Sequence, residues 1–367
     1  MKTKNYFVLL FAFVSMTSCS QDKNPVNYDH DYEVVVPDLT IPWGFVFLPD
    51  GSMLINEKEG KMIHFKEGSK MDVQGVPEVF NRGQGGLLDI ALHPNYNENG
   101  WIYFTFSSPG DNGANTALMR AKLENNSLVN KELLYKATPN TTKTPHFGSR
   151  IVFDNEGYLY FTIGDRGDRD INPQDLTKDG GKVYRLNDDG TIPADNPFLS
   201  EPNAKRAVYS YGHRNPQGMA LHPETGKVWT HEHGPKGGDE INIIKKGANY
   251  GWPVISYGIN YDGTTLTELT EKEGMEQPLH YWDPSIAPSG MAFISTDKYP
   301  GWKGDLMVGS LKFQYMNKVV LKDGKVVKEE RFLDGLGRVR TIHQAPDGYI
   351  YVGIENMGIV KLLPKKE

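Results

Sequence analysis

One pattern of apolar and polar positions recurs along most of this chain. In each copy an apolar strand enters a turn of Pro, Asp, Asn and Gly, and a second strand rich in Tyr, Val, Ile or Trp follows. Six copies occur, at 45–55, 89–104, 151–161, 219–229, 291–308 and 342–352. Repeats of roughly 40–50 residues with several strands per unit are typical of β-propeller blades, which bury their apolar faces by stacking around an axis. The pattern therefore predicts six blades.

The two ends of the repeat region predict how the ring closes. After the sixth copy, residues 358–363 read as one further strand, and residues 32–36 read as a strand ahead of the first copy. We expect 32–36 to complete the last blade as its outer strand, and pairing within the first blade is the alternative. The fold predicted for 32–367 is an all-β, six-bladed β-propeller of four-stranded antiparallel blades, closed by the N-terminal strand.

The first 31 residues differ from the rest and predict export. Lys2 and Lys4 precede an apolar run that is too short to span a bilayer. We interpret 1–18 as a signal peptide and the polar stretch 19–31 as a tether. Cys19 follows the apolar run in a sequence similar to a bacterial lipoprotein processing site, although Met16 replaces the usual leucine. Lipidation of Cys19 would anchor the protein at the periplasmic face of the bacterial cell envelope, and a simple signal peptide with an incidental cysteine is the alternative.

Composition narrows the classes of partner. The 367 residues carry a formal net charge of −6 and no basic block, which argues against a nucleic-acid partner. The 39 glycines and 23 prolines indicate a turn-rich, compact chain, and the 19 tyrosines and 16 phenylalanines favour strands. Because Cys19 is the sole cysteine, an intramolecular disulfide is impossible.

Polar clusters precede the first strand of most copies, where the blades of a propeller meet around the axial mouth. We therefore expect seven side chains to converge there: Gln84, His146, Arg214, Asn215, Lys312, Arg338 and Arg340. Arg338 and Arg340 alternate along a strand and should point the same way. Four cations without compensating charge predict an anion site, and guanidinium groups suit a carboxylate ligand. A surface ion pair is the alternative for any single arginine.

His146 is a candidate base. Asp165, at the far end of the hairpin that follows His146, could hold one imidazole nitrogen and leave the other free near neutral pH. A structural role is the alternative for a lone histidine. We assign that role to His93 and His222, which lie in repeated Leu-His-Pro turns.

The stretch 208–239 contains a candidate metal site. Polar residues cluster at both mouths of one predicted hairpin, and the second cluster ends in the step Gly234-Pro235. Proline has no N–H, so this step leaves carbonyls free, and hard cations such as calcium accept carbonyl oxygens as ligands. An ordinary turn-rich connection is the alternative.

These residues lie in motifs that resemble one known family. In chain order the motifs are GQGGLLD with Gln84, HFGSR with His146, FTIGD with Asp165, YGHRNPQG with Arg214 and Asn215, HGPKGGDEIN with Gly234 and Pro235, NYGWP with Trp252, GSLK with Lys312, and GRVR with Arg338 and Arg340. Together they are similar to the PQQ-dependent aldose sugar dehydrogenases, the soluble glucose/sorbosone dehydrogenase family, over nearly the whole chain after the tether. That family has a six-bladed propeller.

The resemblance implies a reaction and a division of roles. His146 would take the proton from the anomeric hydroxyl of an aldose, oriented by Asp165, while a hydride passes from that carbon to PQQ and leaves a lactone. The residues that would hold the cofactor are Gln84, Arg214, Asn215, Lys312, Arg338 and Arg340. Arg214 would also favour the developing negative charge. Calcium on the carbonyls of Gly234 and Pro235 would polarise the quinone, and an unidentified acceptor would take the electrons.

Two departures from the family leave the substrate open. The glucose-oxidising branch has an acidic residue before the catalytic histidine, where this chain has Pro145, and a glutamine where His233 stands. Both departures favour the broader aldose-oxidising branch. Two other functions are alternatives. A metal-dependent sugar lactonase would centre on carboxylate and Asn ligands rather than on a mouth rich in Arg and Lys. A non-enzymatic sugar-binding propeller would need neither His146 nor Asp165.

Overall fold

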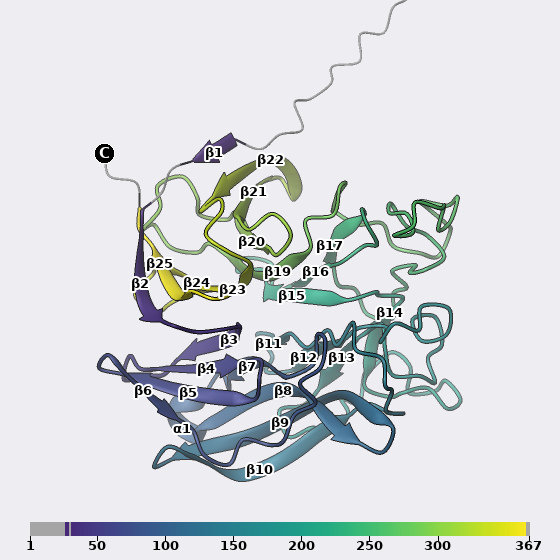
Figure 1. The fold of residues 1–367 in the computed structure, drawn as a ribbon. Coiled ribbons are helices and arrows are strands. Elements are labelled where there is room, and N and C mark those ends of the chain that lie inside the picture. The colour runs from purple at the N-terminus through teal and green to yellow at the C-terminus, as the bar shows by residue number, and fades with distance from the viewer. Residues whose placement is uncertain (1–25, 29–30, 365–367) are drawn as a thin grey trace, which may run out of the picture.

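The computed structural model describes residues 26–28 and 31–364, so the predicted signal peptide at 1–18, Cys19 and most of the tether at 19–31 lie outside the described residues. In this part of the chain the regular elements are strands, apart from one short helix, and they form six separate sheets. The sheets follow one another in chain order around a common centre, as the colours of Figure 1 show. The predicted six-bladed propeller is confirmed. Within 26–28 and 31–364, no helix has the length and apolar character needed to cross a membrane.

The first three blades are four-stranded antiparallel sheets. Their strands are β3 (Pro42–Phe47), β4 (Met53–Glu57), β5 (Lys61–Lys66) and β6 (Ser69–Asp72); β7 (Leu87–Leu92), β8 (Trp101–Gly110), β9 (Gly113–Glu124) and β10 (Ser127–Lys136); and β11 (Ile151–Phe153), β12 (Leu159–Ile163), β13 (Lys182–Leu186) and β14 (Val208–Tyr211). The helix α1 (Tyr96–Asn99) fills the turn between β7 and β8. It ends at Gly100, whose φ of 69° suits a glycine.

The last three blades repeat the arrangement with one addition. Their strands are β15 (Pro216–Leu221), β16 (Val228–Glu232), β17 (Asp239–Ile243) and β18 (His280–Trp282); β19 (Pro288–Phe293), β20 (Leu306–Ser310), β21 (Met316–Lys322) and β22 (Lys325–Phe332); and β23 (Val339–Gln344), β24 (Ile350–Ile354), β25 (Gly358–Leu362) and β2 (Tyr32–Pro37). The short strand β1 (Val26–Tyr28) lies parallel to β22 and gives the fifth blade a fifth strand, which the sequence pattern did not predict.

The N-terminal strand closes the ring as predicted. Strand β2 pairs antiparallel with β25, in a register that sets Tyr32 opposite Leu362 and Val36 opposite Ile359. The last blade is thus built from both ends of the described chain (Figure 1). The alternative, in which this segment pairs within the first blade, is wrong because β3 to β6 form a complete sheet without it.

The first strand of each blade lies innermost, next to the first strands of the neighbouring blades. The apolar faces between blades form the core. Leu54 of the first blade and Phe104 of the second belong to one cluster, and both are completely buried. Burial of such a side chain contributes roughly 1.5–3 kcal/mol, so the stacking of blades stabilises faces that a single blade would leave in water.

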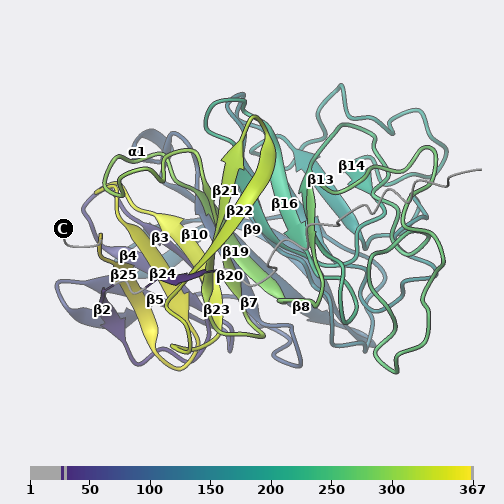
Figure 2. The same cartoon turned by 90° about the horizontal axis from the view of Figure 1, so that it is seen from above.

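Two of the long irregular segments in the third and fourth blades contribute to the candidate site. One, 164–181, connects β12 to β13, and the other, 244–279, connects β17 to β18. Figures 1 and 2 both show irregular chain gathered around β13 and β14, on the side away from β24 and β25. These two loops, with the segments that lead into β11 and β15, build the candidate site.

Candidate active site

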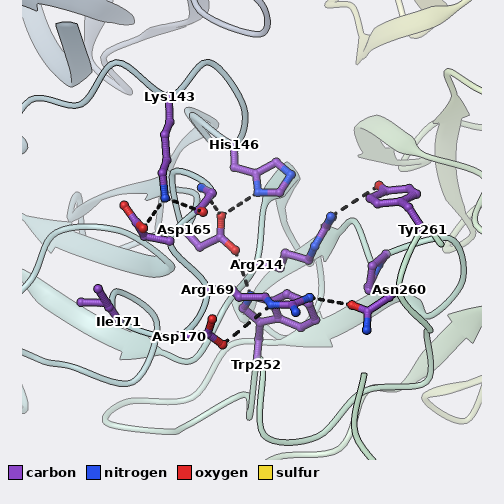
Figure 3. Close-up of a pocket in the computed structure, with 13 residues that line it drawn as sticks. Lys143, His146, Asp165, Arg169, Asp170, Ile171, Arg214, Trp252, Asn260 and Tyr261 are labelled. Carbon is purple, nitrogen blue, oxygen red and sulfur yellow. Dashed lines mark hydrogen bonds and ion pairs between the residues drawn. The ribbon is translucent and has the colours of Figure 1, made fainter. Parts of the chain in front are cut away.

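A cavity of about 390 Å³ lies between the two long loops and the segments that precede β11 and β15 (Figure 3). Its lining residues are Lys143, His146, Asp165, Gly167, Asp168, Arg169, Asp170, Ile171, Arg214, Pro235, Trp252, Asn260 and Tyr261. Four residues predicted from sequence are among them: His146, Asp165, Arg214 and Pro235. The cavity is therefore the place where the predicted base, its partner and one predicted cofactor ligand meet.

The backbone at His146 has an uncommon conformation. Its φ is 59°, in the left-handed region that a residue with a side chain adopts only where its surroundings enforce it. The N–H of His146 donates to Oε1 of Gln84 at 2.7 Å. The buried guanidinium of Arg166 donates to the carbonyls of Pro145 and Lys143. Both contacts hold the loop so that the imidazole reaches the cavity.

His146 and Asp165 form the contact that the predicted roles require. Nδ1 of His146 lies 2.6 Å from Oδ1 of Asp165, and Nε2 has no protein hydrogen-bond partner among the described residues. Burial lowers the pKa of His146 below its ordinary value, aided by the charge of Arg214 and opposed by the hydrogen bond to Asp165. Burial alone would raise the pKa of Asp165, but the hydrogen bond from His146 and the nearby positive charge outweigh it and lower that pKa. An ionised carboxylate beside a neutral imidazole is the arrangement of a general base.

Arg214 lies across the cavity from this pair. Its Nη1 donates to the carbonyls of His233 (3.0 Å) and Gly234 (3.2 Å), and its guanidinium carbon lies 5.3 Å from the ring centre of Trp252. The backbone is fixed as well, because the carbonyl of Arg214 accepts the N–H of Asp165 at 2.7 Å. Asp165, the partner of the base, and the cation are thus joined through the main chain.

The predicted metal loop is a tight turn of carbonyl oxygens. The carbonyl of Gly234 accepts from Arg214, and that of Pro235 accepts the N–H of Gly237 at 2.6 Å. A side chain at position 234 would collide with the carbonyls of Gly237 and Gly238. Within 26–28 and 31–364, no group of three or more His, Cys, Asp and Glu side chains is placed to hold a metal ion. The oxygens that the loop offers to a hard cation are therefore main-chain oxygens.

The prediction that the mouth cations lack compensating charge is wrong for two of them. Arg338 and Arg340 do point the same way, but both pair with the carboxylate of Glu355, Arg338 Nε at 2.8 Å from Oε2. Lys312 is exposed, with its ammonium 4.8 Å from the ring centre of Phe313. These three cations lie outside the lining of the cavity.

Asn215 and Gln84 are not among the residues that line the cavity, but both contact the loop that carries His146. Oδ1 of Asn215 accepts the N–H of Gly148 at 3.1 Å, so it positions the loop that carries His146. Its Nδ2 is buried and has no hydrogen-bond partner within the described part of the chain. Oε1 of Gln84 accepts the backbone N–H of His146, as described above. Both side chains keep an amide group for a further ligand, and their roles toward a cofactor stay predictions.

The sequence pattern missed several residues of the cavity wall. Arg169 donates to Oδ1 of Asn260 at 2.8 Å and so connects the two long loops, while Lys143 pairs with Asp168 (Figure 3). The hydroxyl oxygen of Tyr261 lies 3.4 Å from Nη2 of Arg214. The charged run DRGDRD that starts at Asp165 was a usable signal, since alternating charges directly after a catalytic candidate suggest a lining segment. Nothing in the 250–280 region distinguished Asn260 or Tyr261.

The family model described as Glucose / Sorbosone dehydrogenase matches residues 39–361, which is nearly all of the propeller. Among curated proteins, aldose sugar dehydrogenase YliI of Escherichia coli strain K12 is 42% identical over 329 residues, covering 87% of this chain and 88% of the relative.

Solved structures agree with this likeness. The soluble aldose sugar dehydrogenase of Escherichia coli in its apo-form is 39% identical, with a TM-score of 0.87, and the match covers 91% of this chain and 99% of that one. The PQQ-bound form of aldose sugar dehydrogenase from Streptomyces coelicolor is 29% identical, with a TM-score of 0.72, and covers 93% and 99% of the two chains.

Proposed function

Because this chain belongs to the glucose/sorbosone dehydrogenase family, we propose that it oxidises aldose sugars at the anomeric carbon to lactones, with PQQ as oxidant and calcium as its metal. The observation that carries the proposal is the His146–Asp165 pair, which presents a free Nε2 to a cavity shared with Arg214. A sugar-binding module without chemistry would have no use for a neutral imidazole held against a buried carboxylate.

The chain's own residues supply the proton transfer. Nε2 of His146 takes the proton from the anomeric hydroxyl, and Asp165 stabilises the imidazolium that results. The hydrogen on the anomeric carbon leaves with its electron pair, so the carbon becomes the carbonyl of the lactone. Because burial lowers the pKa of His146, the imidazole is neutral and ready to accept a proton at neutral pH.

The cavity fits an acidic, flat cofactor. PQQ carries three carboxylates, and Arg214 lines the cavity with no carboxylate paired to it among the described residues, together with the rings of Trp252 and Tyr261. Lys143 and Arg169 also line it, but they already pair with Asp168 and Asp170. The buried Nδ2 of Asn215 is a further donor, with no hydrogen-bond partner in 26–28 and 31–364. At the mouth, two arginines share the single carboxylate of Glu355, which leaves a net positive charge. When bound, PQQ supplies the two-electron oxidant that accepts the hydride from the sugar.

The loop at Gly234 and Pro235 fits calcium. A carbonyl oxygen has two lone pairs, and each of these two oxygens accepts one hydrogen bond, so one lone pair of each remains for a cation. Calcium at this position would withdraw electron density from a neighbouring quinone as a Lewis acid.

Reconstitution tests the proposal. The purified chain is stripped with a chelator and assayed for aldose-dependent reduction of a redox dye, with PQQ and calcium added singly and together. We expect dye reduction only when both are present, and loss of activity when the chelator is restored. The product should be the lactone, identified by mass spectrometry before it hydrolyses.

The same preparation separates the alternatives. Hydrolysis of a sugar lactone without PQQ would support the lactonase and contradict the proposal. Binding of aldoses without any dye reduction, in a preparation that binds PQQ, would favour a sugar-binding propeller instead.

We also propose that the chain is held at the bacterial cell envelope through a lipid on Cys19. The support is the sequence alone, since Cys19 lies shortly after the apolar run that ends at Val14 and precedes a polar stretch. Cys19→Ser is expected to move the protein from the membrane fraction to the soluble periplasmic fraction with unchanged activity per molecule. Unchanged membrane association of this variant would contradict the lipid anchor.

A further inference from the structure

Trp252 lies in the wall of the cavity, and its indole N–H has no part in the roles described so far. It follows β17 within the loop 244–279 and is 6% exposed. Both polar groups of its backbone form hydrogen bonds. Its N–H donates to the carbonyl of Gly212, and its carbonyl accepts a hydrogen bond from Nε2 of Gln174, both at 2.8 Å. Such a firmly held ring can position its neighbours.

The indole N–H of Trp252 completes the hydrogen bonds of Asp165. Oδ1 of Asp165 accepts from Nδ1 of His146 and from the N–H of Gly167 at 2.7 Å. Oδ2 accepts from Nε1 of Trp252 at 2.9 Å, its one side-chain partner within the described residues (Figure 3). The side chain of Asp165 is 1% exposed, so water does not replace a lost donor at little cost. Without the indole, the carboxylate would be free to turn toward other donors and leave His146.

The same ring supports Arg214. The guanidinium carbon lies 5.3 Å from the indole centre, within the range of a cation–π contact. Trp252 therefore contacts both partners of the proposed chemistry, one through its edge and one through its face.

We propose that Trp252 is a positioning residue for proton transfer in this enzyme. Its indole N–H fixes the carboxylate of Asp165, which keeps the proton of His146 on Nδ1 and leaves Nε2 to accept the proton of the sugar. The proposal rests on the proposed function for its kinetic consequence, while the link from Trp252 through Asp165 to His146 is a property of the chain without cofactor.

Trp252→Phe tests the kinetic consequence, and Trp282→Phe is its matched control. Trp282 is equally buried, at 6%, and its indole N–H also donates to a carboxylate, Oε2 of Glu329 at 2.7 Å, but it does not line the cavity. We expect Trp252→Phe to lower kcat about 10- to 100-fold, since general-base catalysis contributes about 10²–10⁴-fold, with little change in KM. Trp282→Phe should keep the kcat of the wild type and lose about as much thermal stability as Trp252→Phe.

The tautomer of His146 gives a readout that does not need activity. Nitrogen-15 spectra of the cofactor-free protein, labelled at its ten histidines, are compared with those of His146→Ala to assign the resonances of His146. The wild-type protein and Trp282→Phe are expected to show protonation at Nδ1, and Trp252→Phe a mixture of both tautomers. If Trp252→Phe does not fold, 3-benzothienylalanine at position 252 keeps the shape of the indole and removes the N–H.

The outcomes separate this proposal from the proposed function. If the wild-type chain shows no PQQ-dependent activity, the proposed function fails, but the tautomer of His146 still decides whether Trp252 positions it. An unchanged tautomer in a folded chain without the indole N–H would overturn the proposal. A kcat no lower than that of Trp282→Phe, in an active enzyme, would overturn it as well.

Discussion

Replacing His146 with alanine is expected to lower kcat for aldose oxidation by about 10³-fold, which corresponds to about 4 kcal/mol of transition-state stabilisation. The variant loses the group that accepts the anomeric proton, and no other described side chain holds a neutral imidazole in the cavity. Binding of PQQ should survive, because the cations that fit its carboxylates are untouched. Steady-state kinetics with a redox dye measures kcat, and titration of the stripped protein with PQQ measures the affinity.

His222→Ala is the matched control for this prediction. His222 accepts the N–H groups of Glu224 and Thr225 at its Nδ1, so it fastens the turn between β15 and β16 and does not line the cavity. Its loss should lower stability slightly and leave kcat unchanged. Wild-type activity in His146→Ala, with PQQ bound, would remove the base from the proposed mechanism.

The repeat pattern was sufficient to predict the architecture. Six strand–turn–strand copies predicted six blades, and the apolar strand at 32–36 predicted a closing strand that pairs with β25. Both succeeded because a sheet with one bare apolar face must be covered by a neighbour, and the order of the copies fixes which neighbour is available. Strand β1 could not be found in this way, since three residues that pair with β22 have no periodicity of their own.

The site was predictable where two residues lie on one hairpin and much less so elsewhere. His146 and Asp165 flank β11 and β12, so the fold of one blade brings them within 2.6 Å. Glu355 neutralises part of the charge of Arg338 and Arg340, and the sequence did not predict this. An acidic residue after β24 cannot be distinguished from a surface carboxylate before the strands are arranged in space. Arg169 and Asn260 meet across two irregular loops whose paths no sequence period determines.

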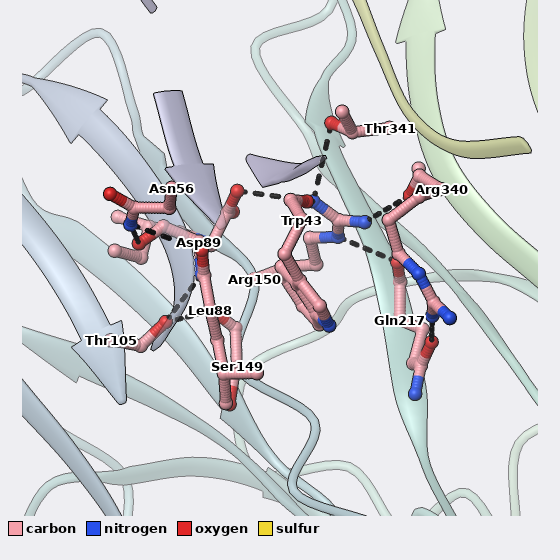
Figure 4. A network of polar contacts seen from close by, with 12 residues as sticks. Trp43, Asn56, Leu88, Asp89, Thr105, Ser149, Arg150, Gln217, Arg340 and Thr341 are labelled. Atoms are coloured by element: carbon pink, nitrogen blue, oxygen red, sulfur yellow. Dashed lines mark hydrogen bonds and ion pairs between the residues drawn. The ribbon is translucent and has the colours of Figure 1, made fainter. Parts of the chain in front are cut away.

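A second large effect, on the stability of the fold, is expected from a residue at the centre of the propeller. Arg150, directly before β11, is 4% exposed and reaches the innermost strands of all the other blades (Figure 4). It pairs with Asp89 of β7 at 3.1 Å. Its hydrogen-bond acceptors are the carbonyl of Trp43 on β3, the carbonyl of Gln217 on β15, Oγ of Ser289 on β19, and the carbonyl of Arg340 and Oγ1 of Thr341 on β23.

Arg150→Met is expected to lower the free energy of unfolding by about 3–5 kcal/mol, because it leaves the buried carboxylate of Asp89 without its counter-ion. Urea unfolding followed by fluorescence and circular dichroism measures the loss. Lys303→Met is the control, since Lys303 forms an exposed pair with Asp297 whose removal should change stability by no more than about 0.5 kcal/mol. An Arg150→Met midpoint close to that of the control would contradict the central role of Arg150.

Arg150→Lys separates charge from geometry. Lysine keeps the positive charge beside Asp89, but its single ammonium cannot reach acceptors that the flat guanidinium contacts from three nitrogens. If charge alone held the centre together, Arg150→Lys would retain most of the stability. We expect it instead to lose at least half of what Arg150→Met loses. The inner strands of the five other blades are stabilised here because one planar group lies within hydrogen-bond distance of all five, and a point charge in the same place leaves several carbonyls buried without a donor.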